Sequence, residues 1–373
     1  MNFLENFLSA FYPVCFGFGA SLLVSILVVL TKRWHGRFSF DASHGIQKLH
    51  VYPTPRIGGV SIMFGLIAAV TVSPLEIRDQ LWPWVLAGVP AFVFGLIEDF
   101  TKRVSVQARL LATMASGMLA WLLTGYVITE VNVWVMDWLL QFTIVSVLFT
   151  AFAVAGVANS INIIDGLNGL AGSMVMWGLL GVAVLAGSLG DTFLASACLI
   201  VIACVLGFFL VNWPFGKLFL GDGGVYLLGF MLAWACVLLV ERNHSVSAFA
   251  ALLFCAHPVI EVSYSMYRRK IRSQHPGHPD RLHFHSLFNR RIVPRLMPNS
   301  SLTLRNSVGG LLIGGLSLLP AIVAQWVYSS TPYSLFCFVG FSVGYVILYK
   351  RVLVKPRSFS QRETLKAADV AVI

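Results

Sequence analysis

Charged residues are scarce in this chain of 373 residues. Asp, Glu, Lys and Arg together make up 11% of it, whereas hydrophobic residues make up 57%. A soluble domain carries about a quarter charged residues, so this deficit excludes an ordinary soluble fold. The length therefore predicts a series of apolar helices of about twenty residues each, rather than two or three soluble domains.

The chain also lacks the cysteine spacing that disulfide frameworks and metal clusters need. All six cysteines lie inside apolar runs and none forms a Cys-x-x-Cys pair. This placement favours buried packing over disulfides or a metal cluster. The N-terminus has no basic residue before its first apolar run, so it does not resemble a cleaved signal peptide.

What remains is a set of about eleven apolar segments, which predicts an all-α polytopic membrane protein. They cover roughly residues 8–31, 57–75, 82–97, 108–127, 133–156, 170–188, 192–212, 223–240, 246–266, 308–328 and 333–349. If the N-terminus is outside and the C-terminus is cytoplasmic, every Lys and Arg except Arg78 and Arg242 falls on the inner side. Membrane sidedness thus explains the net charge of +10, and nucleic acid is not an expected partner.

The domain organisation follows from these segments. Residues 1–350 are predicted to form one transmembrane catalytic domain, and residues 351–373 a basic cytoplasmic tail. Cytoplasmic loops are expected at about 32–56, 98–107, 157–169, 213–222 and 267–306. The polar clusters of the chain all fall in or beside these loops, so chemistry is expected at the cytoplasmic face.

Four polar residues recur three positions apart in an otherwise apolar setting: Asn159, Asn162, Asp165 and Asn168. On a helix such residues share one face. An unpaired carboxylate is expensive in lipid, so this face is expected to meet protein, water or a ligand. The stripe predicts a binding site, and the alternative is a polar seam that joins helices.

Two further carboxylate clusters follow the same pattern. Glu98 and Asp99 end one apolar segment, where they could bind Mg²⁺ or act as a general base, or else form a solvated helix end paired with Lys102 and Arg103. Asp222 lies among glycines at the start of another segment. Helix-start N–H groups can cradle a phosphate there while Asp222 holds Mg²⁺. The alternative is an ordinary Asp N-cap.

Histidines crowd the last cytoplasmic loop, around Arg281. Histidine with arginine favours binding of a pyrophosphate. A basic loop on anionic lipid ranks second and a zinc site third. The residues are His275, His278, Asp280, Arg281, His283 and His285.

Two weaker signals complete the set. Lys48 opens a stretch in which Pro53 and Pro55 lead to Gly58 and Gly59, which indicates either a rigid approach to a tightly packed helix or a plain loop. Glu261 lies one turn after His257 and three residues after Pro258, which is expected to bend the helix. Glu261 and His257 form a satisfied buried pair or line the active cavity, and the second interpretation is favoured.

Taken together, these motifs resemble the polyprenyl-phosphate N-acetylhexosamine-1-phosphate transferase family (glycosyltransferase family 4), which includes the lipid I translocase and the undecaprenyl-phosphate GlcNAc-1-phosphate transferase. The resemblance runs from about Lys48 to Arg291. The residues that carry it are Lys48, His50, Pro53, Thr54, Pro55, Arg56, Gly58, Gly59, Gly95, Glu98, Asp99, Asn159, Asn162, Asp165, Gly166, Gly169, Asn212, Trp213, Pro214, Phe219, Gly221, Asp222, Gly224, Pro258, Glu261, Arg268, Arg269, Asp280, Arg281, His283 and His285.

The resemblance implies an activity. A sugar-1-phosphate would pass from a UDP-sugar to undecaprenyl phosphate with Mg²⁺ (or Mn²⁺) as cofactor, and UMP would leave. The product would start a cell-envelope polysaccharide at a bacterial inner membrane. Membrane lipid is an expected partner, and a homodimer is a further expectation.

The resemblance also implies roles for individual residues. Asp222 would be the main metal ligand, and Asp99 would assist the metal or activate the lipid phosphate. Asp165 would be catalytic and, with Asn162, Asn168, Asn212 and Phe219, would line the nucleotide pocket. The sugar-nucleotide phosphates would be held by His283, Arg281 and His285, with Lys48 at the mouth of the cavity and Glu261 in its lining.

This sequence departs from the family pattern at four positions, which are Glu98, Asn168, Val225 and Ser286. Asn168 removes a charge, so the departures leave the sugar open. The rival interpretations are a secondary transporter, a non-catalytic scaffold of a polysaccharide assembly system and a lipid-phosphate hydrolase. A transporter is disfavoured because the carboxylates lie at one face and no internal repeat is visible.

Overall fold

The computed structural model of the chain describes residues 3–41, 53–273 and 282–354. The predictions made for Lys48 and Arg281 lie outside these residues. So do those for His275, His278 and Asp280 and for most of the tail.

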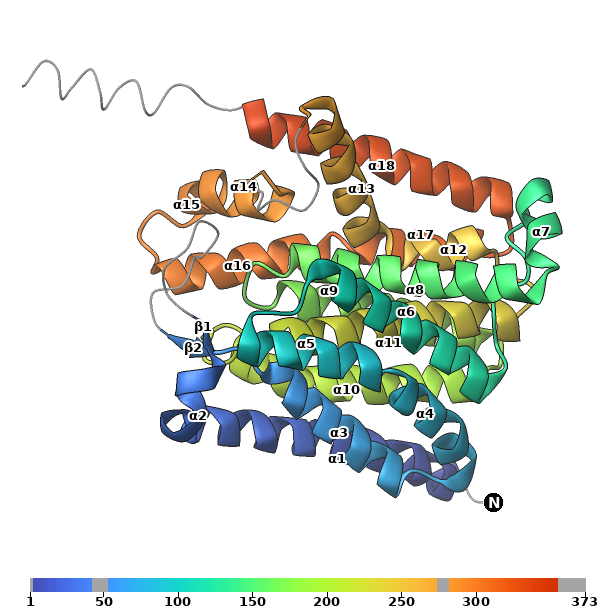
Figure 1. Ribbon diagram of the computed structural model, residues 1–373, viewed down its shortest axis with the longest axis horizontal. Helices are drawn as coiled ribbons and strands as arrows, with labels where there is room; N and C mark the ends of the chain where they lie inside the picture. The colour runs from blue at the N-terminus through green and yellow to red at the C-terminus, as the bar shows by residue number, and fades with distance from the viewer. Residues whose placement is uncertain (1–2, 42–52, 274–281, 355–373) are drawn as a thin grey trace, which may run out of the picture.

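Helices make up almost all of the described structure, and they run roughly along one direction (Figure 1). The first ten are α1 (Phe3–Leu30), α2 (Lys32–Ser39), α3 (Gly58–Val72), α4 (Leu75–Ala87), α5 (Val89–Thr101), α6 (Val106–Thr124), α7 (Trp134–Leu140), α8 (Thr143–Ile164), α9 (Leu170–Ser188) and α10 (Thr192–Asn212). The others are α11 (Gly221–Arg242), α12 (Ala248–Leu253), α13 (Ala256–Ile271), α14 (Phe284–Arg291), α15 (Val293–Leu296), α16 (Leu302–Gly315), α17 (Leu318–Val327) and α18 (Thr331–Val354). Two short strands, β1 (Phe40–Asp41) and β2 (Thr54–Pro55), pair antiparallel.

The structure is that of an all-α polytopic membrane protein. In the described ranges, eight helices are long and apolar enough to cross a membrane, or nine if α4 and α5 count as one bent span. This is fewer than the eleven spans predicted. The difference arises because α3 has only 15 residues and because the predicted segment 246–266 is broken into α12 and α13.

Proline explains one of these interruptions but not the other. The axes of α4 and α5 differ by 42°, and Pro90 lies in the first turn of α5, where it cannot continue the hydrogen bonds of α4. The bend expected at Pro258 is misplaced, since the chain breaks before Ala256 instead. Pro258 then lies in the first turn of α13, where a missing N–H costs little.

Helix α11 forms the centre of the bundle. It contacts α3, α5, α8 and α9, and every residue from Gly221 to Leu239 is buried. A helix that is apolar all round needs protein or lipid on every side, and here other helices supply it. The position of α11 therefore fixes the groups at its two ends relative to the rest of the molecule.

Glycines allow α3 and α5 to approach the first turn of α11 very closely. A Cβ on Gly59 would lie 2.3 Å from the Gly224 nitrogen, and a Cβ on Gly95 would lie 2.6 Å from the Asp222 carbonyl carbon. Small residues at membrane helix interfaces permit such backbone contact. The start of α11 is thereby locked between two helices.

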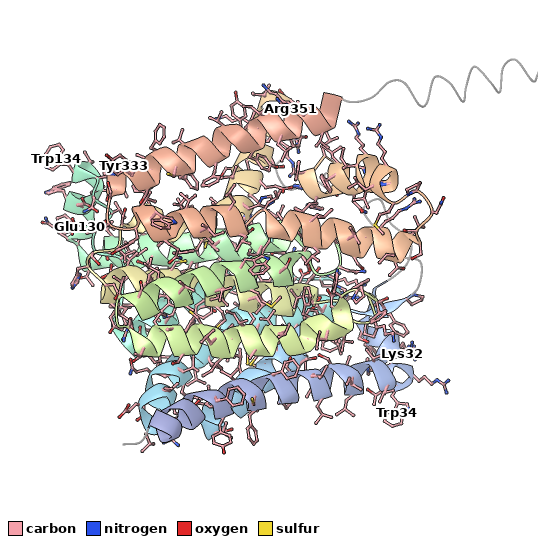
Figure 2. The ribbon with its side chains drawn as sticks, turned by 180° about the vertical axis from the view of Figure 1, so that it is seen from behind. Lys32, Trp34, Glu130, Trp134, Tyr333 and Arg351 are labelled. Carbon is pink, nitrogen blue, oxygen red and sulfur yellow. The ribbon has the colours of Figure 1, made fainter. Side chains whose placement is uncertain are left out.

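The bundle has two chemically different ends. At one end, called the α2 end here, lie α2, β1, β2, α14 and α15; at the other, called the α7 end, lie α7 and the N-terminus (Figure 1). Trp34 and Lys32 mark the α2 end, whereas Trp134 and Glu130 mark the α7 end (Figure 2). Trp34 is 85% exposed and Trp134 is 86% exposed, as expected for side chains at the two membrane interfaces.

Candidate active site

A backbone strap at the α2 end holds the start of α11. The Phe219 N–H donates to the Pro55 carbonyl at 2.8 Å, and the N–H groups of Gly58 and Gly59 donate to Phe219 and Leu220 at 2.9 Å each. The predicted rigid approach to a tightly packed helix is therefore present. The strap brings Arg56, which lies between its hydrogen-bonded residues, to the first turn of α11.

Asp99 caps α11 from the neighbouring helix. Its Oδ1 accepts from the Asp222 N–H at 2.8 Å, and its Oδ2 accepts from the Gly223 N–H at 2.9 Å. A carboxylate at a helix N-terminus satisfies unpaired N–H groups and complements the helix dipole. The N–H groups predicted to cradle a phosphate are thus already used, and Asp222 is not the N-cap of its own helix.

Two arginines neutralise the Asp222 carboxylate. Arg56 Nη2 lies 2.5 Å from Oδ1, and Arg109 Nη1 donates to Oδ2. Arg56 also reaches Asp99, with Nε 3.2 Å from Oδ1. The Asp222 side chain is only 9% exposed, and such buried charges are stable only when paired in this way.

The sequence analysis did not predict that Arg56 and Arg109 pair with Asp222. It counted both residues only as positive charges on the inner side, and it listed Arg56 as part of a motif. A signal was present at Arg109. It lies in the first turn of α6, just after the N-cap Ser105. A cation there opposes the helix dipole, which indicates an anionic partner elsewhere.

Asp165 lies directly after the last residue of α8. Removal from water raises the pKa of Asp165 to about 7; the charge of Arg56 works against this rise and the charge of Asp222 adds to it. Of the three carboxylates that the sequence singled out, Asp99 contacts the start of α11 directly. Asp165 follows α8 and lies near enough for the charges of Arg56 and Asp222 to act on it.

Asn162 contacts Tyr226, a residue that the sequence analysis did not single out. The Asn162 amide donates to the Tyr226 hydroxyl at 3.0 Å. The Arg109 guanidinium lies over the Tyr226 ring, 5.9 Å from its centroid. Tyr226 therefore links Asn162 to the arginine that holds Asp222.

The other asparagines of the predicted site have structural contacts. The Asn168 amide donates to Ser307 at 3.1 Å and its backbone N–H donates to Asn306, both on α16. The Asn212 amide accepts from the Gly169 N–H at 2.7 Å and donates to the Leu218 carbonyl at 2.8 Å. These contacts join the loop after Asp165 to its neighbours, and they do not bring Asn168 to the carboxylates.

Histidines surround a second buried carboxylate, that of Glu261. His283 Nδ1 and His285 Nδ1 lie 3.4 and 3.5 Å from Glu261 Oε1, and His257 Nε2 lies 3.6 Å from Oε2. The same Oε1 accepts from the Phe284 N–H at 2.9 Å. Glu261 therefore positions the His283–His285 segment, and it lies beside His257 as one of the two interpretations expected.

This histidine cluster lies beside Asp165. A Cβ on Gly166 would lie only 2.7 Å from His285 Nε2, so the imidazole lies directly against the residue after Asp165. The absence of a side chain at Gly166 lets the two parts of the site meet. The histidine and carboxylate clusters thus belong to one site at the α2 end.

Glu98, one of the departures from the family pattern, has its own contact. Its Oε2 accepts from the Val104 N–H at 2.8 Å, and Lys102 ends α5 in a left-handed conformation with φ 54°. Glu98 therefore stabilises the turn between α5 and α6.

The donors at this site fit Mg²⁺ in type. Among the residues that the structure describes, no three His, Cys, Asp or Glu side chains surround a common point that could hold a metal ion. Mg²⁺ needs only one or two carboxylates when water and substrate phosphates complete its shell. Asp222 and Asp99 offer such oxygens, and arginine nitrogens now occupy them.

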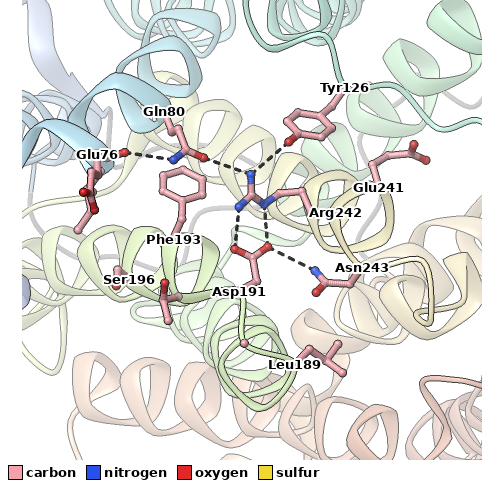
Figure 3. A pocket seen from close by; sticks show the side chains of 13 residues that line it. Glu76, Gln80, Tyr126, Leu189, Asp191, Phe193, Ser196, Glu241, Arg242 and Asn243 are labelled. Carbon is pink, nitrogen blue, oxygen red and sulfur yellow. Dashed lines mark hydrogen bonds and ion pairs between the residues drawn. The ribbon is translucent and has the colours of Figure 1, made fainter.

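A polar pocket of about 750 Å³ lies at the α7 end, far from this site. Arg242 forms its centre (Figure 3): its Nε and Nη2 donate to Asp191 at 2.7 and 2.9 Å, and its Nη1 donates to Gln80 and Tyr126 at 3.2 Å each. All three nitrogens are used, so this network joins α4, α10, α11 and the end of α6. Burial would raise the pKa of Asp191, but the hydrogen bonds from Arg242 and the Leu194 N–H hold it below its usual value.

Comparisons with known proteins indicate the family of this chain. Residues 81–240 match the family model described as glycosyl transferase family 4. A Bacillus subtilis protein named "Probable undecaprenyl-phosphate N-acetylglucosaminyl 1-phosphate transferase" is 26% identical over 265 residues, which cover 71% of this chain and 74% of that protein. The undecaprenyl-phosphate alpha-N-acetylglucosaminyl 1-phosphate transferases of Yersinia pestis and Salmonella typhi are 29% and 27% identical, over 65% and 72% of this chain and 68% and 74% of their own lengths. Residues 81–240 therefore match glycosyl transferase family 4, and the chain is a distant homologue of the undecaprenyl-phosphate GlcNAc-1-phosphate transferases.

Proposed function

We propose that this enzyme transfers an N-acetylhexosamine-1-phosphate from a UDP-sugar to undecaprenyl phosphate and releases UMP, which starts a cell-envelope polysaccharide. The observation that carries the proposal is the carboxylate and arginine cluster around Asp222, at the end of the bundle where the motifs meet. Its family supports this class of reaction. The amino sugar is inferred from the names of the relatives.

The α2 end is proposed to face the cytoplasm. This orientation places the N-terminus outside and the C-terminus inside, with one transmembrane catalytic domain followed by a basic tail. The positive-inside rule supports it, because every Lys and Arg except Arg78 and Arg242 falls in a segment that this orientation places on the cytoplasmic side. Undecaprenyl phosphate and UDP-sugar would then meet at the inner surface of a bacterial inner membrane.

The reaction would be a displacement at phosphorus. An oxygen of the lipid phosphate attacks the phosphorus bonded to the sugar, and the bond from that phosphorus to the UMP oxygen breaks. UMP leaves, and a lipid pyrophosphoryl sugar remains. A phosphate monoester is already largely ionised near neutral pH, so the attacking oxygen needs no base.

Asp222 is proposed as the main metal ligand and Asp99 as its support. When bound, Mg²⁺ (or Mn²⁺) would neutralise the phosphates and stabilise the charge that develops in the transition state. The cap that Asp99 places on α11 supports a role in aiming Asp222 rather than in removing a proton. Asp165 and Asn162 would line the nucleotide side of the same cavity.

The histidine cluster is proposed to hold the phosphates of the sugar nucleotide. His283 and His285 lie side by side with nearly parallel rings, and Glu261 positions both. Arg281 and Lys48 would add positive charge at the mouth of the cavity. The half-buried Phe219 ring would stack on the uracil, while Asn212 and Asn168 would shape the pocket through their loops.

Label transfer tests the proposed activity. Purified protein is incubated with Mg²⁺, undecaprenyl phosphate and a panel of radiolabelled UDP-sugars. Label entering the lipid phase with equimolar UMP release is expected for one amino sugar. Release of inorganic phosphate would show a hydrolase, and absence of both products with every sugar would refute the proposal.

A further inference from the structure

The carboxylates of Asp99 and Asp222 are matched by two guanidinium groups without a metal ion. Asp99 and Asp222 supply two negative charges, and Arg56 and Arg109 supply two positive charges. Both oxygens of Asp222 are engaged by guanidinium groups. A divalent cation that binds Asp222 must therefore displace an arginine from it, or the site would hold a surplus of positive charge in a poorly screened place.

Arg109 has a donor left over for another anion. Its Nε is buried and makes no hydrogen bond within the described residues, although its Nη1 is bound to Asp222. A buried unpaired donor is costly, and the planar guanidinium matches the geometry of a phosphate. The side chain is anchored at the start of α6, where the helix dipole also favours a negatively charged partner.

We propose that Arg56 and Arg109 stand in for the divalent cation in the metal-free enzyme, and that Arg109 passes to a substrate phosphate when the cation binds Asp222. This inference rests on the proposed function. Cation binding and phosphate binding then depend on each other. The cation neutralises Asp222 in place of Arg109, and the phosphate neutralises the Arg109 charge that is thereby released. Such coupling is reciprocal, so the phosphate tightens metal binding by the same factor by which the metal tightens phosphate binding.

Metal binding without turnover tests the proposal. Free Mn²⁺ is measured by EPR spectroscopy in titrations of detergent-solubilised protein, alone, with UDP, or with undecaprenyl phosphate. For the wild type, one of the two phosphates is expected to tighten Mn²⁺ binding about tenfold. Arg109→Gln is expected to bind Mn²⁺ about tenfold more tightly than wild type without phosphate and to lose most of the coupling.

Two variants control for charge and folding. Arg103→Gln removes an exposed cation close to Arg109 in the sequence, so wild-type binding and coupling are expected. Arg109→Lys keeps a charge beside Asp222 and is expected to restore weak Mn²⁺ binding without phosphate. Equal Mn²⁺ affinity and equal coupling in wild type and Arg109→Gln would overturn the proposal.

The metal site itself is tested separately. Asp222→Asn is expected to abolish the tight Mn²⁺ binding seen in Arg109→Gln when the two changes are combined. Unaltered binding in the double variant would count against Asp222 as the ligand, and so against the proposed function. The phosphate that fails to change Mn²⁺ affinity in the wild type is not the partner of Arg109, and failure of both would refute the coupling.

Discussion

Removing the Asp99 carboxylate is expected to loosen the start of α11. Asp99→Ala leaves the N–H groups of Asp222 and Gly223 without an acceptor in a buried place, and Arg56 loses one of its two carboxylates. Breaking a buried, hydrogen-bonded charge in this way costs about 3–5 kcal/mol. Asp99→Asn keeps one acceptor oxygen, so its expected cost is smaller, about 1–3 kcal/mol.

The measurement is unfolding in mixed SDS micelles, followed by circular dichroism, together with label transfer. Both Asp99 variants are expected to unfold at lower SDS fractions and to lose activity, with alanine the more severe. Glu98→Gln is the matched control, since it removes the neighbouring charge but keeps an acceptor for the Val104 N–H. If Asp99→Ala unfolded at the wild-type SDS fraction, Asp99 would not hold α11 in place.

Three further changes probe other parts of the molecule. Asp222→Asn should lower transfer by about 100-fold or more, since metal-assisted charge stabilisation is worth several kcal/mol. The protein should stay folded at a cost of about 1–3 kcal/mol, because the amide keeps one acceptor for the arginines; retained turnover would remove Asp222 from the metal site. Gly166→Ala should displace the His285 ring, because the new Cβ would lie 2.7 Å from Nε2; a roughly tenfold to hundredfold loss of activity in a folded protein is expected, and normal kinetics would separate the histidines from Asp165. Asp191→Asn should cost about 1–3 kcal/mol at pH 7, measured by the same unfolding assay. Because the pKa of Asp191 is lowered in the folded protein, this stabilisation is fully present above the ordinary pKa of 3.8 and is lost as the pH falls from there through the lowered pKa; a difference from wild type that did not shrink as the pH fell below 3.8 would contradict the ion-pair explanation.

The membrane-helix architecture could be predicted from composition, but the helix breaks could not. Each predicted apolar segment corresponds to a helix or a helix pair, because apolar length alone indicates a span. Apolar length does not reveal where a span is interrupted. The break before Ala256 illustrates this, since it comes ahead of Pro258 rather than at it.

The carboxylates could be predicted as a group, whereas their partners could not. An Asp in an apolar chain is conspicuous, and the structure brings Asp99 to the first turn of α11, which carries Asp222. Arg109 is not conspicuous, because a basic residue beside a membrane helix is ordinary. Its pairing with Asp222 depends on how α6 packs near α11, which no local pattern encodes.

The contacts of Asn168 fit the alternative interpretation of the polar stripe, a seam that joins helices. Its spacing in the polar stripe predicted a site residue, and its contacts with Ser307 and Asn306 are those of a helix-joining residue. Polar residues in membrane proteins serve both purposes. The three-residue spacing alone cannot distinguish a binding residue from a helix-joining residue, because the partner helix α16 lies more than a hundred residues away in the sequence.

The unbroken run of α11 from Gly221 to Arg242 has a mechanical consequence. At 1.5 Å per residue it is a rod of about 30 Å, comparable to the hydrocarbon thickness of a bilayer. One end of the helix carries Asp222, and the other carries the ion pair between Arg242 and Asp191. A bilayer of different thickness would therefore be met by tilting this rod together with its neighbours. The spacing between Asp222 and the loops at the α7 end is thus built into the protein and does not depend on the lipid.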